Sequence, residues 1–192
     1  MLADIRTETP DDQAVVRGLL LDAFDDDIPA RLVELLRTSA VDRPELSFVA
    51  VSDDRVVGYV KLSDVELHGD RRFVALNLTP LAVATDSQGR GIGRSLVEHA
   101  LHAAENVSSD PLVILEGDPR HYHRYGFRRA SAAGIERPSP TIPDAAFQFI
   151  ALSRYDPSVH SGRVAYPAPF HELGLLGTDT AAASSAPAPD RA

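Results

Sequence analysis

Three closely spaced glycines stand within residues 88–93, Gln-Gly-Arg-Gly-Ile-Gly, which run directly into a segment with helical periodicity. The apolar positions of that segment fall on one face of a helix: Ile92, Leu96, Val97, Ala100, Leu101 and Ala104. Because glycine has no side chain, backbone N–H groups between glycines can approach a ligand closely. Amides that begin a helix lack intrahelical partners and favour an anion. The stretch therefore predicts a binding site for a phosphate or pyrophosphate group.

Two common phosphate-binding motifs do not fit this stretch. A mononucleotide P-loop requires Lys followed by Ser or Thr after its last glycine, where this chain has Ile92 and Gly93. The dinucleotide fingerprint G-x-G-x-x-G fails from Gly89 and from Gly91, because Arg94 or Leu96 takes the place of its third glycine. The phosphate site is thus of neither standard nucleotide-binding type.

A bulged strand is predicted immediately before the glycines. Apolar residues first alternate on one face of the strand, at Val74, Leu76 and Leu78. Beyond Pro80 they shift by one residue, to Leu81 and Val83. A β-bulge produces such a change of phase, and proline within strands is mostly confined to bulges and edges. We therefore expect the backbone polar groups of residues 81–83 to be partly free of strand pairing.

These features resemble the acetyl-CoA motif of the GNAT superfamily of N-acetyltransferases, (Gln/Arg)-x-x-Gly-x-(Gly/Ala). The motif is matched at Gln88, Gly91 and Gly93, and the Leu-Ala-Val end of the bulged strand precedes it. The resemblance implies acetyl-CoA as co-substrate, without a metal. By this resemblance and the argument from free amides, the cofactor-binding residues are Leu81, Ala82, Val83, Gln88, Gly89, Arg90, Gly91, Ile92, Gly93, Arg94 and Ser95.

A second segment, residues 116–127, also resembles this superfamily, in which a short helix after the fifth strand commonly ends in Phe/Tyr-Tyr-x-x-x-Gly-Phe. Tyr122, Gly126 and Phe127 match the last three fixed positions, and His121 takes the aromatic position before them. Together with Gly-Asp-Pro and a late Gly-Arg-Val-x-Tyr-Pro, the motifs look like the YhbS-like predicted acetyltransferases of bacteria. The resemblance spans roughly residues 5–170.

By the same resemblance, Tyr122 is the general acid that faces the CoA sulfur; the alternative is an aromatic packed in the core. Glu116, at the end of a predicted strand, is the preferred general base, with a helix-capping role as its alternative. Asp118 fits that cap better, since it directly precedes a proline at a helix start. His121 and His123 point apart on a helix, so at most one faces the crevice and a zinc site is not expected.

Two further polar side chains, Asn77 and Glu66, lie on neighbouring predicted strands, and alternation alone leaves open which of them faces a substrate. The acidic run at residues 25–27 is interpreted as a solvated loop between helices or as a rim that attracts an amine.

The helices and strands that must position these residues are predicted to form an α/β fold, with a central mixed sheet flanked by helices. Strands are expected at residues 3–7, 45–52, 55–67 and 72–83, at 112–115, from 127 and at 145–152. Helices are expected at residues 10–24, 28–37, 92–105 and 120–125, and residues 162–170 form a proline-rich closing segment. The bulged strand, helix and strand 112–115 predict a parallel crossover, as in the GNAT acyl-CoA N-acyltransferase fold. Ligands in such sheets bind at the carboxyl ends of diverging strands, beside the helix start, the bulge and Glu116.

Composition bounds the function further. The 192 residues suit one domain, assigned to residues 1–175, with a disordered tail predicted at 176–192. The chain has no cysteine, which excludes disulfides and a cysteine-bound acyl intermediate. A formal charge of −9 argues against nucleic-acid binding and is compatible with amine substrates. No apolar run approaches a membrane span and no signal peptide is evident, so a cytoplasmic location is expected.

The sequence therefore predicts an N-acetyltransferase that transfers acetyl from acetyl-CoA to a primary amine by direct attack in a ternary complex. Two alternatives remain at this stage: a CoA-binding regulatory module without activity, and a transferase of a longer acyl group. The acceptor amine is open, and pairing of two copies through the late strands is a possible homodimer.

Overall fold

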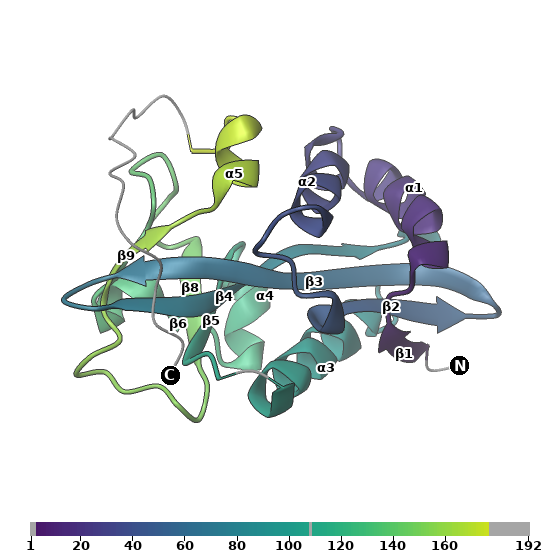
Figure 1. Ribbon diagram of the computed structural model, residues 1–192. Coiled ribbons are helices and arrows are strands. Elements are labelled where there is room, and N and C mark those ends of the chain that lie inside the picture. Colours follow the sequence, from purple (N-terminus) through teal and green to yellow (C-terminus); the bar gives the residue numbers. More distant parts are fainter. Residues whose placement is uncertain (1–2, 108, 177–192) are drawn as a thin grey trace.

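A long hairpin of β3 and β4 runs through the middle of one mixed sheet in the computed structural model, which describes residues 3–107 and 109–176 (Figure 1). Residues 177–192, which hold most of the predicted tail, lie outside the described residues. The strands are β1 Asp4–Thr7, β2 Ser47–Ser52, β3 Arg55–His68, β4 Arg72–Val83, β5 Leu112–Glu116, β6 Arg128–Arg129, β7 Ile135–Glu136, β8 Phe147–Ala151 and β9 Gly162–Ala165. The helices are α1 Gln13–Ala23, α2 Ile28–Arg37, α3 Ile92–Val107, α4 Pro119–Tyr122 and α5 Ala168–Glu172.

Within the described residues, nine strands form this sheet, in the order β1-β2-β3-β4-β5-β8-β6. Strand β9 pairs with β3 beyond the end of β2, and β7 pairs with β9. Asp53 and Asp54 form the turn between β2 and β3 with positive φ values of 49° and 57°. Short polar side chains tolerate this left-handed region, which explains why this pair marks the hairpin.

The predicted bulge is confirmed in β4. Val60 of β3 pairs with Leu81, whereas Leu62 pairs with Leu78, so Thr79 and Pro80 together oppose a single β3 residue. Inserting one extra residue reverses which side chains face each side of the sheet. This is the physical origin of the phase shift in the apolar pattern.

The predicted parallel crossover is also confirmed, because β4 is followed by α3 and then by β5, which pairs in parallel with β4. The pairing joins Leu76 to Val113 and Asn77 to Ile114. The part of β4 beyond Asn77 pairs with β3 alone among the described strands. The edge of β4 after the bulge is therefore free of β5, as expected for residues 81–83.

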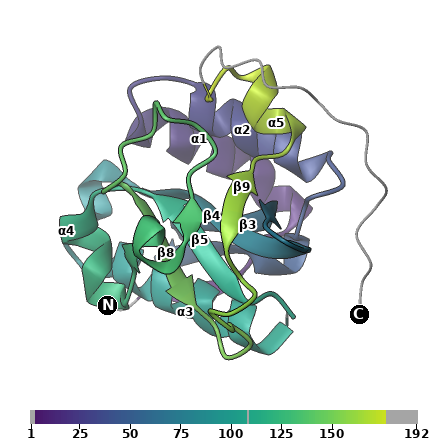
Figure 2. The same ribbon diagram turned by 90° about the vertical axis from the view of Figure 1, so that its left-hand side faces the viewer.

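Helices cover both faces of the sheet. Figures 1 and 2 show α1, α2 and α5 together on one face and α3 on the other. The α3 side of the core includes Leu62, Leu78, Leu96, Val97 and Val113. On the opposite side, Leu32, Leu36, Ile114, Phe147 and Phe170 pack together. Because β5 is buried on both faces, its sequence is a near-continuous apolar run.

The end of the chain differs from the sequence-based expectation. Residues 162–170 were expected to form a proline-rich closing segment, but they contain β9 and the beginning of α5. The first turn of the predicted helix 10–24 is a separate 3-10 turn at Pro10–Asp12. Short strands such as β9 are weakly specified by local pattern, because they depend on pairing with a distant partner, here Glu66–His68 of β3. In the part of the chain that the structure describes, no helix is both long and apolar enough to cross a membrane.

Candidate active site

The glycine-rich turn before α3 has an open backbone. Gly89 and Gly91 adopt positive φ values of 75° and 85°, a conformation that side chains other than glycine rarely take. A Cβ atom built on either residue would meet no atom within 4 Å. Space therefore remains above the turn, next to the first amides of α3, which have no intrahelical partner. The turn has the properties of an anion-binding helix start.

Contacts with the end of β4 hold this turn in place. The Gln88 side chain donates its Nε2–H to the carbonyl oxygen of Val83 at 3.1 Å. A Cβ on Gly93 would lie 3.5 Å from the Val83 side chain. Ile92 is buried against Gly58 of β3, so only its backbone faces the turn. The free edge of β4 and the helix start consequently form one continuous backbone surface.

The other predicted cofactor-binding residues flank this surface. Arg90 is exposed, and Arg94 is also exposed but pairs with Glu98 at 2.8 Å. The N–H of Ser95 donates to the Gly91 carbonyl oxygen at 3.0 Å, which leaves its hydroxyl for other contacts. Ala82 is buried in the cluster beneath α1 and offers its backbone rather than its side chain. Leu81 instead lines a cavity.

That cavity, here called the transfer pocket, has a volume of about 290 Å³ and brings together Glu116 and Tyr122, the two predicted catalytic residues, with Leu81 of the bulge. Its walls come from α2, the segment before it, β4, β5, α4 and the chain around α5. The lining residues are Phe24, Ile28, Pro29, Leu32, Asn77, Leu78, Thr79, Pro80, Leu81, Glu116, Tyr122, Tyr166, Phe170 and Leu175.

Glu116 accepts a hydrogen bond from the Tyr166 hydroxyl at 2.7 Å. Glu116 is exposed to solvent, but the surrounding protein partly desolvates its carboxylate. This desolvation raises the pKa of Glu116, and the hydrogen bond from Tyr166 partly offsets the rise. The alternative role as helix cap falls to Asp118, whose carboxylate accepts the N–H of Arg120 at 2.8 Å. Glu116 is thus available within the pocket as a proton acceptor.

Tyr122 is half-buried at the end of α4 and both packs against the core and lines the pocket. Its ring lies edge-on to Phe127, with the centroids 5.9 Å apart. A Cβ on Gly117 would come within 2.3 Å of the ring, so glycine permits this approach. Burial, with a smaller contribution from Tyr125, raises the pKa of Tyr122 to about 12. Its hydroxyl is therefore protonated at neutral pH and can donate a proton.

The remaining candidates lie around this pocket rather than in its wall. The ring of His121 stacks edge-on against Tyr122, while Nδ1 of His123 lies 3.1 Å from the Pro119 carbonyl oxygen. Neither histidine lines the pocket. The acidic run 25–27 connects Phe24 and Ile28, which do line the pocket, and its three residues are exposed to solvent.

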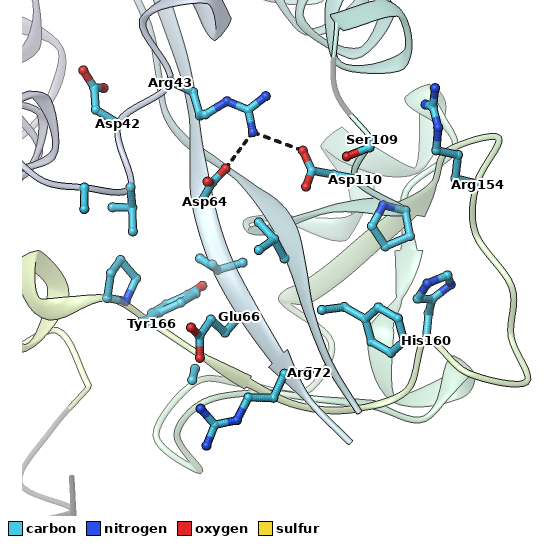
Figure 3. Close-up of a pocket in the computed structure, with 18 of the residues that line it drawn as sticks. Asp42, Arg43, Asp64, Glu66, Arg72, Ser109, Asp110, Arg154, His160 and Tyr166 are labelled. Atoms are coloured by element: carbon cyan, nitrogen blue, oxygen red, sulfur yellow. Dashed lines mark hydrogen bonds and ion pairs between the residues drawn. The ribbon is translucent and has the colours of Figure 1, made fainter. Parts of the chain in front are cut away.

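Asn77 and Glu66 are separated by the fold. Asn77 lines the transfer pocket, whereas Glu66 lies within 2.5 Å of the His68 ring and lines a different, larger cavity of about 1020 Å³. In that larger cavity Arg43 is held between Asp64 and Asp110, at 2.9 and 3.2 Å (Figure 3). Tyr166 lines both cavities.

Sequence reasoning gave Tyr166 no role. Its Gly-Arg-Val-x-Tyr-Pro context was noted as a motif, but nothing local links residue 166 to residue 116. The motif was therefore the only feature of the sequence that could have indicated a functional role for Tyr166. The apolar wall formed by Phe24, Ile28 and Leu32 carries no motif, so the sequence placed these residues only within or beside the expected helices at 10–24 and 28–37.

Comparison with known proteins places this geometry in a family. A profile of the Acetyltransferase (GNAT) domain matches residues 43–129, which include the glycine turn and Tyr122. The Escherichia coli (strain K12) protein named Uncharacterized N-acetyltransferase YhbS is 34% identical over 151 residues, or 78% of this chain and 87% of that protein. The chain belongs to the GNAT family of acetyltransferases.

Solved GNAT structures support the same assignment. The crystal structure of the Escherichia coli GNAT family N-acetyltransferase YhbS in complex with CoA matches with a TM-score of 0.83 and 32% identity, covering 92% of this chain and 96% of that one. A GNAT family acetyltransferase from Brucella melitensis, in complex with acetyl-CoA, matches with a TM-score of 0.68 and 28% identity, covering 88% and 97%. The expected GNAT fold is confirmed, with its bulged strand beside the parallel crossover.

Proposed function

We propose that this chain is an acetyl-CoA-dependent N-acetyltransferase that acts on a primary amine by direct attack in a ternary complex. The observation that carries the proposal is the transfer pocket, which is lined by Glu116, by Tyr122 and by Leu81, the residue after the bulge. Titratable groups with shifted pKa values that converge in one apolar cavity are a common feature of active sites. The two solved relatives with bound CoA and acetyl-CoA support the choice of co-substrate.

Binding of acetyl-CoA is assigned to the glycine turn and to the free edge of β4. The amides around Gly89–Gly93 bind the pyrophosphate at the start of α3. The backbone of residues 81–83 holds the pantetheine arm, since its polar groups are not used by β5. An N–H of this edge stabilises the oxyanion that forms at the thioester carbonyl. The substrate thioester is thereby directed to the transfer pocket.

Two proton transfers complete the reaction. Glu116 accepts a proton from the amine nitrogen as its lone pair forms a C–N bond with the thioester carbonyl carbon. Tyr122 donates its proton to the sulfur as the C–S bond breaks, so CoA leaves as a thiol. The phenolate of Tyr122 is reprotonated from solvent, and Glu116 returns its proton to solvent. The acetyl group passes directly to the amine, which agrees with the lack of any cysteine that could carry it as an acyl-enzyme intermediate.

Replacement of Tyr122 by Phe tests the assigned acid. Phenylalanine keeps the packing against Phe127 but removes the proton donor, so kcat with acetyl-CoA and an amine panel should fall about 100-fold. The rise in melting temperature caused by acetyl-CoA should be retained, since the glycine turn is unchanged. Tyr125→Phe is the matched control, because Tyr125 lies beside Tyr122 but outside the pocket lining, and it should keep wild-type kcat.

Two results would contradict the proposal. If millimolar acetyl-CoA fails to raise the melting temperature of the wild-type protein, the binding assignment is wrong. If acetyl-CoA binds but no amine is acetylated, the CoA-binding regulatory module becomes the better description. A preference for longer acyl-CoA substrates would instead show that the volume beside Leu81 accommodates a longer chain.

A further inference from the structure

Asn77 is a buried polar residue with an unmet hydrogen-bonding requirement. Its side chain is 2% exposed and lines the transfer pocket. Among the described residues, its Oδ1 atom is fully enclosed and has no hydrogen-bond partner. Leaving a buried carboxamide oxygen unpaired is unfavourable, because the atom gives up its hydrogen bonds to water and gains none in the protein. An unpaired carboxamide on a residue that lines a substrate pocket indicates a partner that arrives with the substrate.

The strand register places Asn77 beside Glu116. Asn77 pairs with Ile114 in the parallel β4–β5 ladder, and Glu116 lies two residues further along β5. Positions two apart share one face of a strand, so Glu116 projects from the same face as Ile114. The offset is about 7 Å along the strand and about 4.8 Å across the ladder. Side chains from these two positions can therefore reach a single atom held between them.

The chemistry of amide formation requires two different partners for an attacking amine. A neutral primary amine has a lone pair and two N–H bonds. The lone pair attacks the thioester, one proton leaves to the base, and the other N–H remains in the amide product. A carboxamide oxygen can accept that retained N–H throughout the reaction but cannot remove its proton. Asn77 can turn about its last side-chain bond to present this oxygen to the pocket.

We propose that Asn77 holds the retained N–H of the acceptor while Glu116 takes the other, and that the acceptor is a compact primary amine with an apolar body. This inference rests on the proposed function. Asn77 is then a residue that sets specificity for primary over secondary amines, because a secondary amine has no second N–H for it. With a secondary amine bound, the Asn77 carboxamide oxygen would still have no hydrogen-bond donor.

The pocket lining sets the rest of the acceptor's chemistry. Nine of its fourteen residues are apolar: Phe24, Ile28, Pro29, Leu32, Leu78, Pro80, Leu81, Phe170 and Leu175. Glu116 is the single carboxylate among them, so the lining offers no second anionic partner for a polycation. Burying an unpaired ammonium group is strongly unfavourable. A volume of about 290 Å³ lies at the lower end of the range for small-molecule pockets, which favours a compact acceptor.

The test compares 2-phenylethylamine with N-methyl-2-phenylethylamine in the wild-type protein and in Asn77→Leu. Leucine has a similar shape and no polar atoms. We expect wild type to favour the primary amine in kcat/KM by at least about tenfold, and the variant to lose most of this preference. The melting temperature of Asn77→Leu should be unchanged or higher, because the Asn77 side chain makes no hydrogen bond to any residue that the structure describes. The shift in melting temperature with acetyl-CoA should equal that of wild type.

An equal loss of kcat/KM for both amines in Asn77→Leu, or a marked drop in its melting temperature, would show that Asn77 is structural and would overturn its role. Spermidine, a polyamine without an apolar body, tests the assigned class of acceptor. If wild type acetylates spermidine but neither phenylethylamine, the assigned substrate class is wrong while the transferase function stands. If acetyl-CoA binds and none of the three amines is acetylated, the proposed function and this inference fail together.

Discussion

At the scale of single residues, the hydrogen bond from Tyr166 to Glu116 lowers the pKa of a carboxyl group that desolvation raises. In the proposed reaction the carboxylate must be ionised to accept a proton. Because the pKa of Glu116 is raised, we expect activity to fall as the pH decreases through a value above the pKa of an ordinary glutamate. The Tyr166 hydroxyl, at 2.7 Å, stabilises the ionised form and holds this pKa lower than burial alone would. We therefore propose that Tyr166 is a positioning residue that acts through Glu116.

We expect Tyr166→Phe to move the acidic limb of the pH profile of kcat/KM to higher pH, because the pKa of Glu116 rises further when the hydrogen bond is lost. At pH values well above this limb, the variant should recover much of its activity. Tyr155→Phe is the control: the Tyr155 hydroxyl is buried without a partner in the described structure, and Tyr155 lies outside the pocket lining. An acidic limb that is unchanged in Tyr166→Phe would contradict the coupling.

At the scale of one element, the glycine turn leaves open space beside the start of α3, where we propose that the pyrophosphate of CoA binds. Gly91 has a φ of 85°, so Ala there should cost about 1–2 kcal/mol in backbone strain and also place a methyl group in the open space above the turn. We expect Gly91→Ala to raise the Kd for CoA about tenfold or more, measured by isothermal titration calorimetry, since relieving that strain moves the amides.

Gly18→Ala is the matched control for this element. Gly18 lies within α1 with no atom within 4 Å of a built Cβ, so Ala should stabilise the protein by about 0.5–1 kcal/mol. CoA affinity should be unchanged in this variant. Equal affinities for CoA in the two variants would show that the turn does not contact the ligand.

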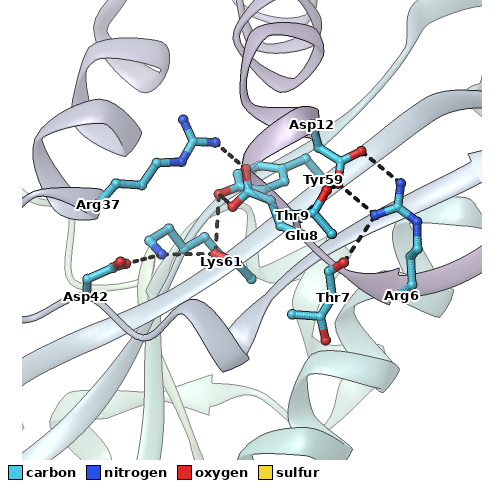
Figure 4. Close-up of polar contacts among 10 residues, drawn as sticks. Arg6, Thr7, Glu8, Thr9, Asp12, Arg37, Asp42, Tyr59 and Lys61 are labelled. Atoms are coloured by element: carbon cyan, nitrogen blue, oxygen red, sulfur yellow. Dashed lines mark hydrogen bonds and ion pairs between the residues drawn. The ribbon is translucent and has the colours of Figure 1, made fainter.

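At the scale of the whole molecule, a buried polar network ties the sheet to the helical layer that forms one wall of the transfer pocket. Lys61 of β3 is 1% exposed and donates to Asp42 at 2.5 Å and to Ser47 at 2.9 Å (Figure 4). Arg37, at the end of α2, forms an ion pair with Glu8, just after β1. Since α2 also carries Leu32 of the pocket wall, the network fixes that wall relative to the sheet.

We expect Lys61→Met to lower the free energy of unfolding by about 3–5 kcal/mol, because Asp42 would be left without its partner in a largely buried position. Urea unfolding monitored by circular dichroism measures this loss. The double variant Lys61→Met with Asp42→Asn should recover part of it, since the unpaired charge is then absent. If Lys61→Met alone unfolds at the same urea concentration as the wild-type protein, the Lys61–Asp42 pair does not stabilise the fold as described.

Local pattern in the sequence determined the glycine turn, the bulge and the order of most elements. The shift of apolar positions across Pro80 involves only a few neighbouring residues, so the bulge can be predicted without knowing the fold. The absence of cysteine likewise limited the chemistry from composition alone. Gln88–Gly93 and Tyr122–Phe127 were recognised because each motif is contiguous.

The tertiary structure decided which side chains share the pocket. Tyr166 reaches Glu116 across fifty positions of sequence, through the pairing of β9 with β3, and no local periodicity encodes such a contact. The alternation of β4 allowed Asn77 either face, and the register with β5 put it on the side of Glu116. Local free energies select turns and periodicities, whereas the faces and partners of side chains depend on the packing of the whole sheet.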